Sequence, residues 1–215
     1  MTHENRIVDA LLDRHGRTFC DEAGIRIETN KPAPLFQSLC LALLFSARIR
    51  ASIAVDAMRA LLDRGWTTAE HMAEAEWGDR VDALNGAGYA RFDEKTSTML
   101  GDAAELLLDR YRGDLRRLRA AAGDKPEDER RRLKEVKGIG DVGVDIFFRE
   151  AQTAWPELYP FADAKSLAGA RALGLPDEAG ELAQLVERDD FARLVTALVR
   201  MELAGDADAI RAAAD

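Results

Sequence analysis

Hydrophobic positions recur at intervals of three and four residues along nearly the whole chain. That spacing puts apolar side chains on one face of an α-helix, and no segment sustains the period-two alternation of a half-buried strand. The pattern therefore predicts an all-α protein. The expected helices are residues 4–14, 35–47, 50–64, 68–75, 77–84, 91–110, 114–121, 126–136, 141–153, 164–173, 178–187 and 189–204, with a weaker one at 206–213.

The size of the chain sets the number of domains. Its 215 residues, 47% of them hydrophobic, suffice for one domain or two small lobes with a real core. The longest apolar run, Leu39 to Phe45, is far too short to span a membrane, and the first residues lack the apolar core of a signal peptide. We expect a cytoplasmic protein without a membrane-embedded part.

Only two cysteines are present, Cys20 and Cys40, and neither has a close partner in the sequence. A structural zinc site or an iron–sulfur cluster needs several cysteine or histidine ligands at short spacing. The sequence therefore predicts no cysteine-ligated cluster, and both cysteines are expected to be buried thiols.

Residues 133–143 read LKEVKGIGDVG, with two glycines one residue apart between two predicted helices. Glycine at Gly138 and Gly140 tolerates unusual backbone angles and removes the Cβ atoms that would block a close approach. The first N–H groups of the following helix lack intrahelical partners and lie at its positive end, which suits a phosphate. Such a turn can grip a DNA backbone without reading its sequence. An ordinary helix–helix corner is the alternative.

A second candidate is Asp163, in the stretch FADAKSLAGARALG, directly before a predicted helix. A carboxylate at this position accepts hydrogen bonds from the first N–H groups and is favoured by the helix dipole. We expect it to be ionised at neutral pH. Aspartate is also one of the commonest helix caps, so a purely structural role is the alternative.

Together these stretches resemble the helix-hairpin-helix DNA glycosylases of the endonuclease III type. That family has a hairpin close to L-P-G-V-G, followed some twenty residues later by an essential aspartate on an interrupted loop. Here VKGIG stands at 136–140 and FAD at 161–163, so Asp163 follows Gly140 by 163 − 140 = 23 positions. KPEDERRRLKEV at 125–136 and LFQSLCLALLFSARIR at 35–50 resemble the helices that precede the hairpin. The resemblance extends from about Pro34 to Leu175.

The resemblance implies two helical lobes with a helix-hairpin-helix motif and a DNA-binding cleft between them. Residues 29–155 would form the lobe that carries the motif, at about 126–153. Residues 1–28 and 156–215 would form the second, discontinuous lobe, which carries the catalytic Asp163. The target nucleotide would be rotated out of the duplex into a pocket.

The same resemblance implies a set of contacts. The residues expected to contact DNA are Lys137, Gly138, Ile139, Gly140, Val142, Gly143, Arg48, Tyr89 and Lys165. Backbone carbonyls of Lys134, Val136 and Ile139 could coordinate a monovalent cation, and no other cofactor is expected. Arg48 could fill the space left by the flipped base or be a surface arginine. Tyr89 could be inserted between bases or pack in the core beside Phe92.

Two departures from the family pattern change the expected chemistry. Val142 stands where bifunctional members carry the lysine that forms a Schiff base, so strand-cleaving lyase activity is not expected. Residues 176–215 contain no cysteine, so the iron–sulfur loop of endonuclease III relatives is absent from this sequence.

The charge distribution neither requires nor excludes DNA binding. The formal net charge is −9, but residues 109–137 hold eleven basic and seven acidic side chains, a local charge of +4. This segment could be a DNA-binding footprint, or its acids and arginines could simply compensate helix dipoles.

The sequence leads to three alternatives. The leading hypothesis is a monomeric, monofunctional DNA N-glycosylase that acts on lesion-bearing double-stranded DNA and releases a base that the sequence does not identify. The others are a non-catalytic helix-hairpin-helix DNA-binding protein and a helical protein-interaction module.

Overall fold

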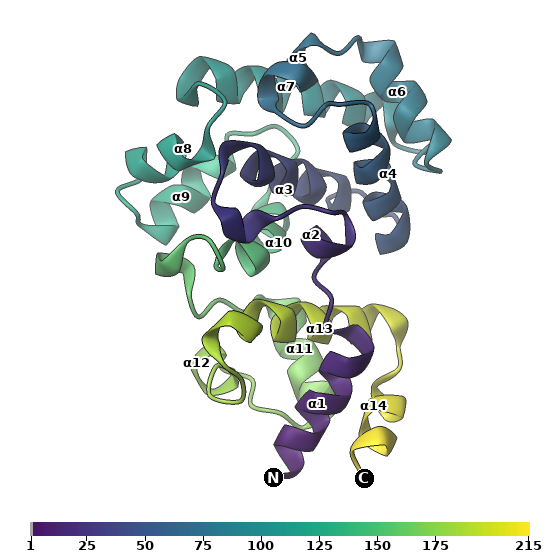
Figure 1. Ribbon diagram of the computed structural model, residues 1–215, viewed down its shortest axis with the longest axis vertical. Helices are drawn as coiled ribbons and strands as arrows, with labels where there is room; N and C mark the ends of the chain where they lie inside the picture. Colours follow the sequence, from purple (N-terminus) through teal and green to yellow (C-terminus); the bar gives the residue numbers. More distant parts are fainter. Residues whose placement is uncertain (1) are drawn as a thin grey trace. The chain divides into compact units, whose positions relative to one another are not determined.

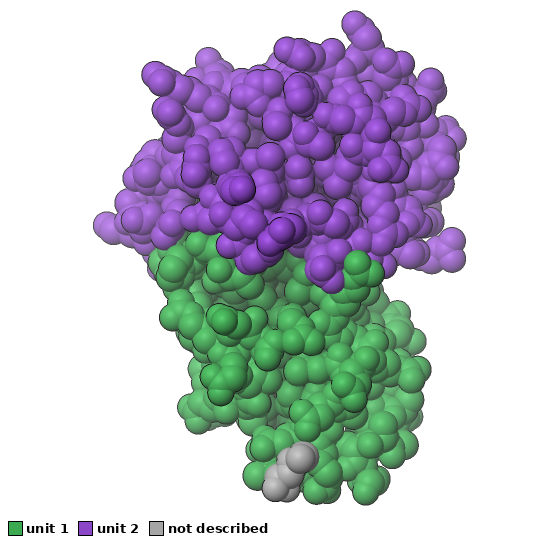
Figure 2. Space-filling view, viewed as in Figure 1, with its two compact units in different colours: residues 1–19, 148–215 green, residues 20–147 purple. Residues whose placement is uncertain are grey.

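The computed structural model describes residues 2–215, and within them all regular structure is helical (Figure 1). The chain forms two compact units (Figure 2). Unit 2 is Cys20–Phe147, and unit 1 combines Met1–Phe19 with Phe148–Asp215. The all-α prediction is confirmed.

Unit 2 is built around one helix that is buried on nearly all sides. Its elements are α2 (Phe19–Glu22), which begins one residue before the unit, η1 (Ile27–Thr29), α3 (Pro32–Phe45), α4 (Ala51–Asp63), α5 (Ala69–Glu74), α6 (Trp77–Gly86), α7 (Asp93–Tyr111), α8 (Leu115–Ala121), α9 (Pro126–Leu133) and the first part of α10 (Asp141–Ala151). Every residue from Ser38 to Leu44 in α3 is buried. A helix that is apolar all round belongs in a core, and α4, α7 and α8 pack against α3.

Unit 1 joins the two ends of the chain. Its elements are α1 (His3–His15), the end of α10, η2 (Pro156–Leu158), α11 (Ala164–Leu173), α12 (Ala179–Leu182), η3 (Arg188–Asp190), α13 (Phe191–Ala204) and α14 (Ala207–Ala214). Helix α13 packs against α1 and α11. A Cβ added to Gly169 of α11 would lie 2.7 Å from the carbonyl oxygen of Leu198, so glycine permits this close helix crossing.

The unit borders differ from the predicted lobe borders at residues 29 and 155. Residues 20–28 lie with unit 2, because the Cys20 thiol contacts Ser38 at 3.4 Å and Arg59 donates to the carbonyl of Glu22 at 3.1 Å. Residues 148–155 lie with unit 1, where the rings of Phe148 and Phe161 meet edge to face at 5.6 Å.

The predicted helices agree with the structure except near a few ends. The helix expected at 178–187 stops at Leu182, because the N–H groups of Gln184 and Leu185 bond three residues back rather than four. The helix expected at 126–136 stops at Leu133. The short helix α2 was not predicted, since four residues carry no periodic pattern.

None of the helices among residues 2–215 has both the length and the apolar character that crossing a lipid bilayer requires.

Candidate nucleic-acid interface and the Asp163 site

The turn between α9 and α10 is tightly wound and anchored from inside unit 2. After Leu133 the N–H groups of Glu135 and Val136 bond to carbonyls three residues back, and the N–H of Ile139 donates to the carbonyl of Val136 at 2.9 Å. The side chains of Val136 and Ile139 are buried. These contacts fix the backbone of the turn, while Lys137, Gly138 and Gly140 stay exposed. The α9–turn–α10 segment is a helix-hairpin-helix motif.

The two hairpin glycines have different reasons to be glycine. Gly138 has φ +95, and a Cβ there would lie 2.6 Å from the sulfur of Met99 on α7. The fold itself therefore requires Gly138. Gly140 has no positive φ, and a Cβ there would meet nothing within 4 Å. Nothing in the fold demands glycine at 140, so its bare backbone leaves room for a group from outside.

Helix α10 begins with open N–H groups. The carbonyl of Gly140 accepts from the N–H of Val144 at 3.0 Å, which makes Gly140 the cap residue, and glycine has no side chain to bond back. Within residues 2–215 the N–H groups of Asp141, Val142 and Gly143 have no hydrogen-bond acceptor in the structure. Val142 is 68% exposed beside them. This helix start has the donors and the dipole that an anion would use.

Ion pairs within unit 2 reduce the charge available near the hairpin. Lys134 bonds to Asp141 at 2.8 Å, and Lys137 bonds to Asp102 at 3.0 Å. The hydrogen bond from Lys134 lowers the pKa of the Asp141 carboxyl, so Asp141 is negative at neutral pH. Further pairs in the basic segment are Arg110–Glu135, Arg116–Asp114, Arg119–Asp124, Arg130–Asp145 and Arg131–Asp128. These further pairs include acids that the local charge of +4 already counts. Asp102, Asp141 and Asp145 lie outside residues 109–137, so their pairs with Lys137, Lys134 and Arg130 offset three of the four net positive charges.

The carbonyls expected to hold a monovalent cation lie in the same turn. The carbonyl of Val136 already accepts the N–H of Ile139, which leaves one of its two lone pairs, whereas within residues 2–215 those of Lys134 and Ile139 have no backbone donor. Each of the three oxygens therefore keeps at least one lone pair free of backbone donors, and the cation stays a prediction.

Asp163 caps α11 and is almost completely enclosed. Its Oδ1 accepts the backbone N–H and the hydroxyl of Ser166, both at 2.7 Å, and its Oδ2 is paired with the guanidinium of Arg149. Burial by itself raises the pKa of Asp163. The attraction of Arg149 and the hydrogen bonds from Ser166 outweigh that effect and leave the pKa below its ordinary value. The expected ionised cap is present.

Arg149, in the last turn of α10, and Gln152, directly after the helix, hold the segment that leads to Asp163. The side-chain amide of Gln152 donates to the carbonyls of Arg149 at 2.7 Å and Phe161 at 3.0 Å, and its oxygen accepts the N–H of Phe161 at 3.0 Å. Sequence reasoning missed both residues. The available signal was the polar stretch of Arg149, Glu150 and Gln152 directly after the apolar residues 146–148.

The remaining predicted contacts differ in exposure. Tyr89 is a core residue: its side chain is fully buried, its hydroxyl donates to the carbonyl of Leu44 at 2.7 Å, and its ring meets Phe92 edge to face. The packing alternative therefore describes Tyr89, and the insertion between bases expected for it is contradicted by this burial. Arg48 and Lys165 are exposed, Gly143 is buried against Ser46 and Ile139, and their DNA contacts stay predictions. The hairpin belongs to unit 2 and Asp163 to unit 1, so their meeting across a common cleft also stays a prediction.

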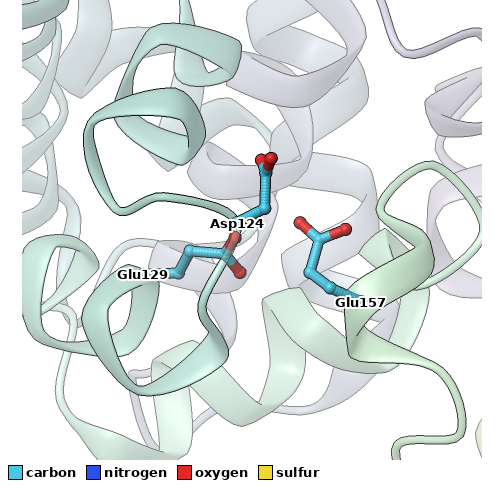
Figure 3. Close-up of side chains that lie close together, drawn as sticks. All are labelled: Asp124, Glu129 and Glu157. Carbon is cyan, nitrogen blue, oxygen red and sulfur yellow. The ribbon is translucent and has the colours of Figure 1, made fainter.

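Three carboxylates shown in Figure 3 do not define a metal site. Asp124 and Glu129 belong to unit 2, whereas Glu157 belongs to η2 of unit 1. Asp124 already has a counter-charge in Arg119 at 3.2 Å. The two carboxylates of one unit fall short of the ligand number that calcium or magnesium requires, and we assign no metal to them.

Comparisons with known proteins add little to this geometry. No family model matches the chain, and no curated protein matches it. Among solved structures the chain is similar to one described as "Structure of a Trapped Endonuclease III-DNA Covalent Intermediate: Estranged-Adenine Complex". The TM-score is 0.47 at 13% identity, over 76% of this chain and 71% of that chain. A likeness at this level says nothing about function. Any proposal of a function therefore rests on the hairpin and on Asp163.

Proposed function

We propose that the protein is a monofunctional DNA N-glycosylase that holds the backbone of a lesion-bearing duplex on the hairpin and releases a base. The observation that carries the proposal is the start of α10, where the exposed residues Asp141 and Val142 have N–H groups without an acceptor in the described part of the chain and Gly140 is unhindered. Such a site suits a phosphate oxygen, because each N–H donates to it and the helix dipole favours its charge. Exposed Arg48 and Lys165 are further candidate DNA contacts.

Asp163 supplies the negative charge in this proposal. Release of a base by cleavage of the N-glycosidic bond develops positive charge on the sugar, and an ionised carboxylate stabilises that state. A carboxylate whose pKa is lowered is also a weak base, so charge stabilisation fits Asp163 better than proton abstraction from water. Val142 offers no amine at the hairpin, which favours hydrolytic release without strand cleavage.

A non-catalytic DNA-binding protein is the second candidate, and one observation favours it. The Asp163 side chain is only 5% exposed and is paired with Arg149, as a purely structural cap would be. Such a protein would keep the hairpin contact and release no base.

A panel of lesion-bearing duplexes separates these candidates. The protein is incubated with duplexes that carry uracil, an oxidised pyrimidine, an alkylated purine or a mismatch, and nicking is measured with and without alkali. A glycosylase without lyase activity gives nicks only after alkali, and Asp163→Asn should reduce them by on the order of 100-fold or more. The matched control is Asp177→Asn, which removes an exposed carboxylate paired with Arg171 in the same unit.

The binding measurement decides what remains if no base is released. Salt-dependent duplex binding without release from any lesion supports the non-catalytic candidate. Absence of salt-dependent binding removes both candidates and leaves the helical interaction module.

A further inference from the structure

The charge on Asp163 needs a physical cause, because a carboxylate withdrawn from water ordinarily takes up a proton. Its side chain is 5% exposed, and it sits in unit 1 between the end of α10 and the start of α11. If Asp163 were protonated it could still cap the helix, but it could not stabilise positive charge on a sugar. The group that keeps the proton away is therefore as important as the carboxylate.

Among the charged groups around Asp163, one side chain can keep the carboxylate ionised. Arg149 is itself only 4% exposed, and its guanidinium contacts Oδ2. On the helix that Asp163 caps, Ser166 donates two neutral hydrogen bonds, and Lys165 is exposed. Glu150, next to Arg149 on α10, accepts the backbone N–H of Phe19 at 2.8 Å. Arg149 is thus the positive charge in direct contact with the carboxylate.

We propose that Arg149 is a positioning residue that holds Asp163 as a fixed, negatively charged carboxylate within the site of the proposed glycosylase. The catalytic consequence of this role rests on the proposed function. The effect of Arg149 on the charge of Asp163 does not depend on it. The two hydrogen bonds from Ser166 and the contact with Arg149 occupy three of the roughly four acceptor positions of a carboxylate. The carboxylate therefore has little freedom to turn.

The pair retains an attraction for positive charge although its net charge is zero. A cation that contacts the carboxylate oxygens directly is nearer to them than to the guanidinium, and Coulomb attraction falls with distance. The cation is therefore attracted overall. A neutral side chain in place of Arg149 would remove the counter-charge and leave burial to raise the proton affinity of Asp163.

Gln152 makes the pair rigid. Its amide ties the carbonyl of Arg149 to both backbone groups of Phe161, two residues before Asp163. The two charged residues are thus held by the same polar bridge, and the distance between them does not depend on the ion pair alone.

The test measures the titration of Asp163 directly and then the pH dependence of base release. Aspartate carboxyl carbons are labelled with ¹³C, and the Asp163 resonance is identified by its loss in Asp163→Asn. The titration is followed in the wild type, Arg149→Met, Arg149→Lys and Ser166→Ala. The matched control is Arg171→Met, which removes an arginine from the exposed pair with Asp177 on α11.

The expected results form an ordered series. Aspartate ordinarily titrates near pH 4, and in the wild type Asp163 titrates below that pH. In Arg149→Met it titrates above that pH, in Ser166→Ala it moves up by less, and in Arg149→Lys and Arg171→Met it stays low. Base release by Arg149→Met at neutral pH falls on the order of 100-fold and recovers as pH rises through the new titration point, while Arg149→Lys restores most of it.

Specific outcomes overturn the proposal. A wild-type Asp163 that titrates at or above the usual range of aspartate shows that Arg149 does not set its charge, and this result needs no variant of Arg149. The same titration point in Arg149→Met and wild type has the same meaning. If Arg149→Met does not fold, Ser166→Ala and the wild type still give the titration. If Asp163 moves as expected but the wild type releases no base, the glycosylase function is wrong and the effect of Arg149 on Asp163 stands.

Discussion

The starts of α10 and α11 treat their first N–H groups in opposite ways, although an aspartate accompanies each. At α11, Asp163 is the cap residue and uses the N–H of Ser166 itself. At α10 the cap residue is Gly140, and Asp141 comes one position later, where its carboxylate is held by Lys134 at 2.8 Å. The start of α11 is closed by the side chain of its own cap residue, and the start of α10 is left open for an external acceptor.

In the proposed glycosylase the two helix starts would have different tasks. The closed start fixes one negative charge in a buried place, as a group that stabilises positive charge must be fixed. The start of α10 presents, at the exposed residues Asp141 and Val142, donors with no acceptor of their own among residues 2–215, as a site that grips a backbone phosphate must. Both tasks are needed in the proposed glycosylase, and variants of each site can be compared.

The largest expected effect comes from breaking the closed start. Asp163→Ala removes the cap and leaves Arg149 buried without its counter-charge, so the free energy of unfolding should fall by about 3–5 kcal/mol. Asp141→Ala at the start of α10 removes an exposed carboxylate and should leave the free energy of unfolding nearly unchanged. Urea unfolding followed by circular dichroism measures both. Losses of equal size would contradict the contrast.

The second effect is the pH dependence of the stabilisation that Asp163 provides. The pKa of Asp163 is lower in the folded protein than in the unfolded chain, so its contribution is complete above the unfolded pKa, about 4. The contribution is lost as pH falls through the folded pKa, because protons then bind both states. Unfolding free energies measured between pH 3 and 7 should fall toward acid more steeply in the wild type than in Asp163→Asn. Parallel curves would show that Asp163 has no lowered pKa.

The sequence predicts the open start better than the closed one. The period of the apolar residues gives the helices, and the two glycines directly mark the tight turn between α9 and α10. Only three-dimensional packing distinguishes the role of Gly138 from that of Gly140. The Met99 sulfur that makes Gly138 necessary lies almost forty residues earlier in the chain. Similarly, nothing local to Tyr89 indicates that its hydroxyl reaches the carbonyl of Leu44.

The closed start was predicted only in part. The position of Asp163 before an apolar helix identifies it as a cap. Its burial and its partner Arg149 depend on how the end of α10 packs against the 161–163 segment, and no local pattern records that contact. The pairing of the basic segment is hidden for a related reason, because composition counts charges and does not show which of them are paired.

The third effect tests the internal support of the open start. Gly138→Ala forces a residue with a Cβ into φ +95 and against the sulfur of Met99, so it should lower the free energy of unfolding by about 1–3 kcal/mol. Gly140→Ala meets no atom within 4 Å and should change stability by less than about 0.5 kcal/mol. Thermal and urea unfolding of the two variants give the comparison. Equal destabilisation would mean that the fold needs both glycines and that Gly140 does not mark an external contact.

The smallest effect is the most informative about function. Gly140→Ala should fold as the wild type does, but its methyl group occupies the space in which a phosphate would approach the open N–H groups of α10. We expect duplex affinity to fall about tenfold, equivalent to about 1.4 kcal/mol. Fluorescence anisotropy with a labelled duplex at several salt concentrations measures the change.

The matched control is Gly78→Ala, an exposed glycine in α6 whose added Cβ also meets nothing within 4 Å. Because Gly140→Ala removes no charge, the salt dependence should keep its slope while the affinity drops. Wild-type affinity in Gly140→Ala would show that the open helix start does not hold DNA, even if Asp163 is as firmly fixed as its contacts indicate.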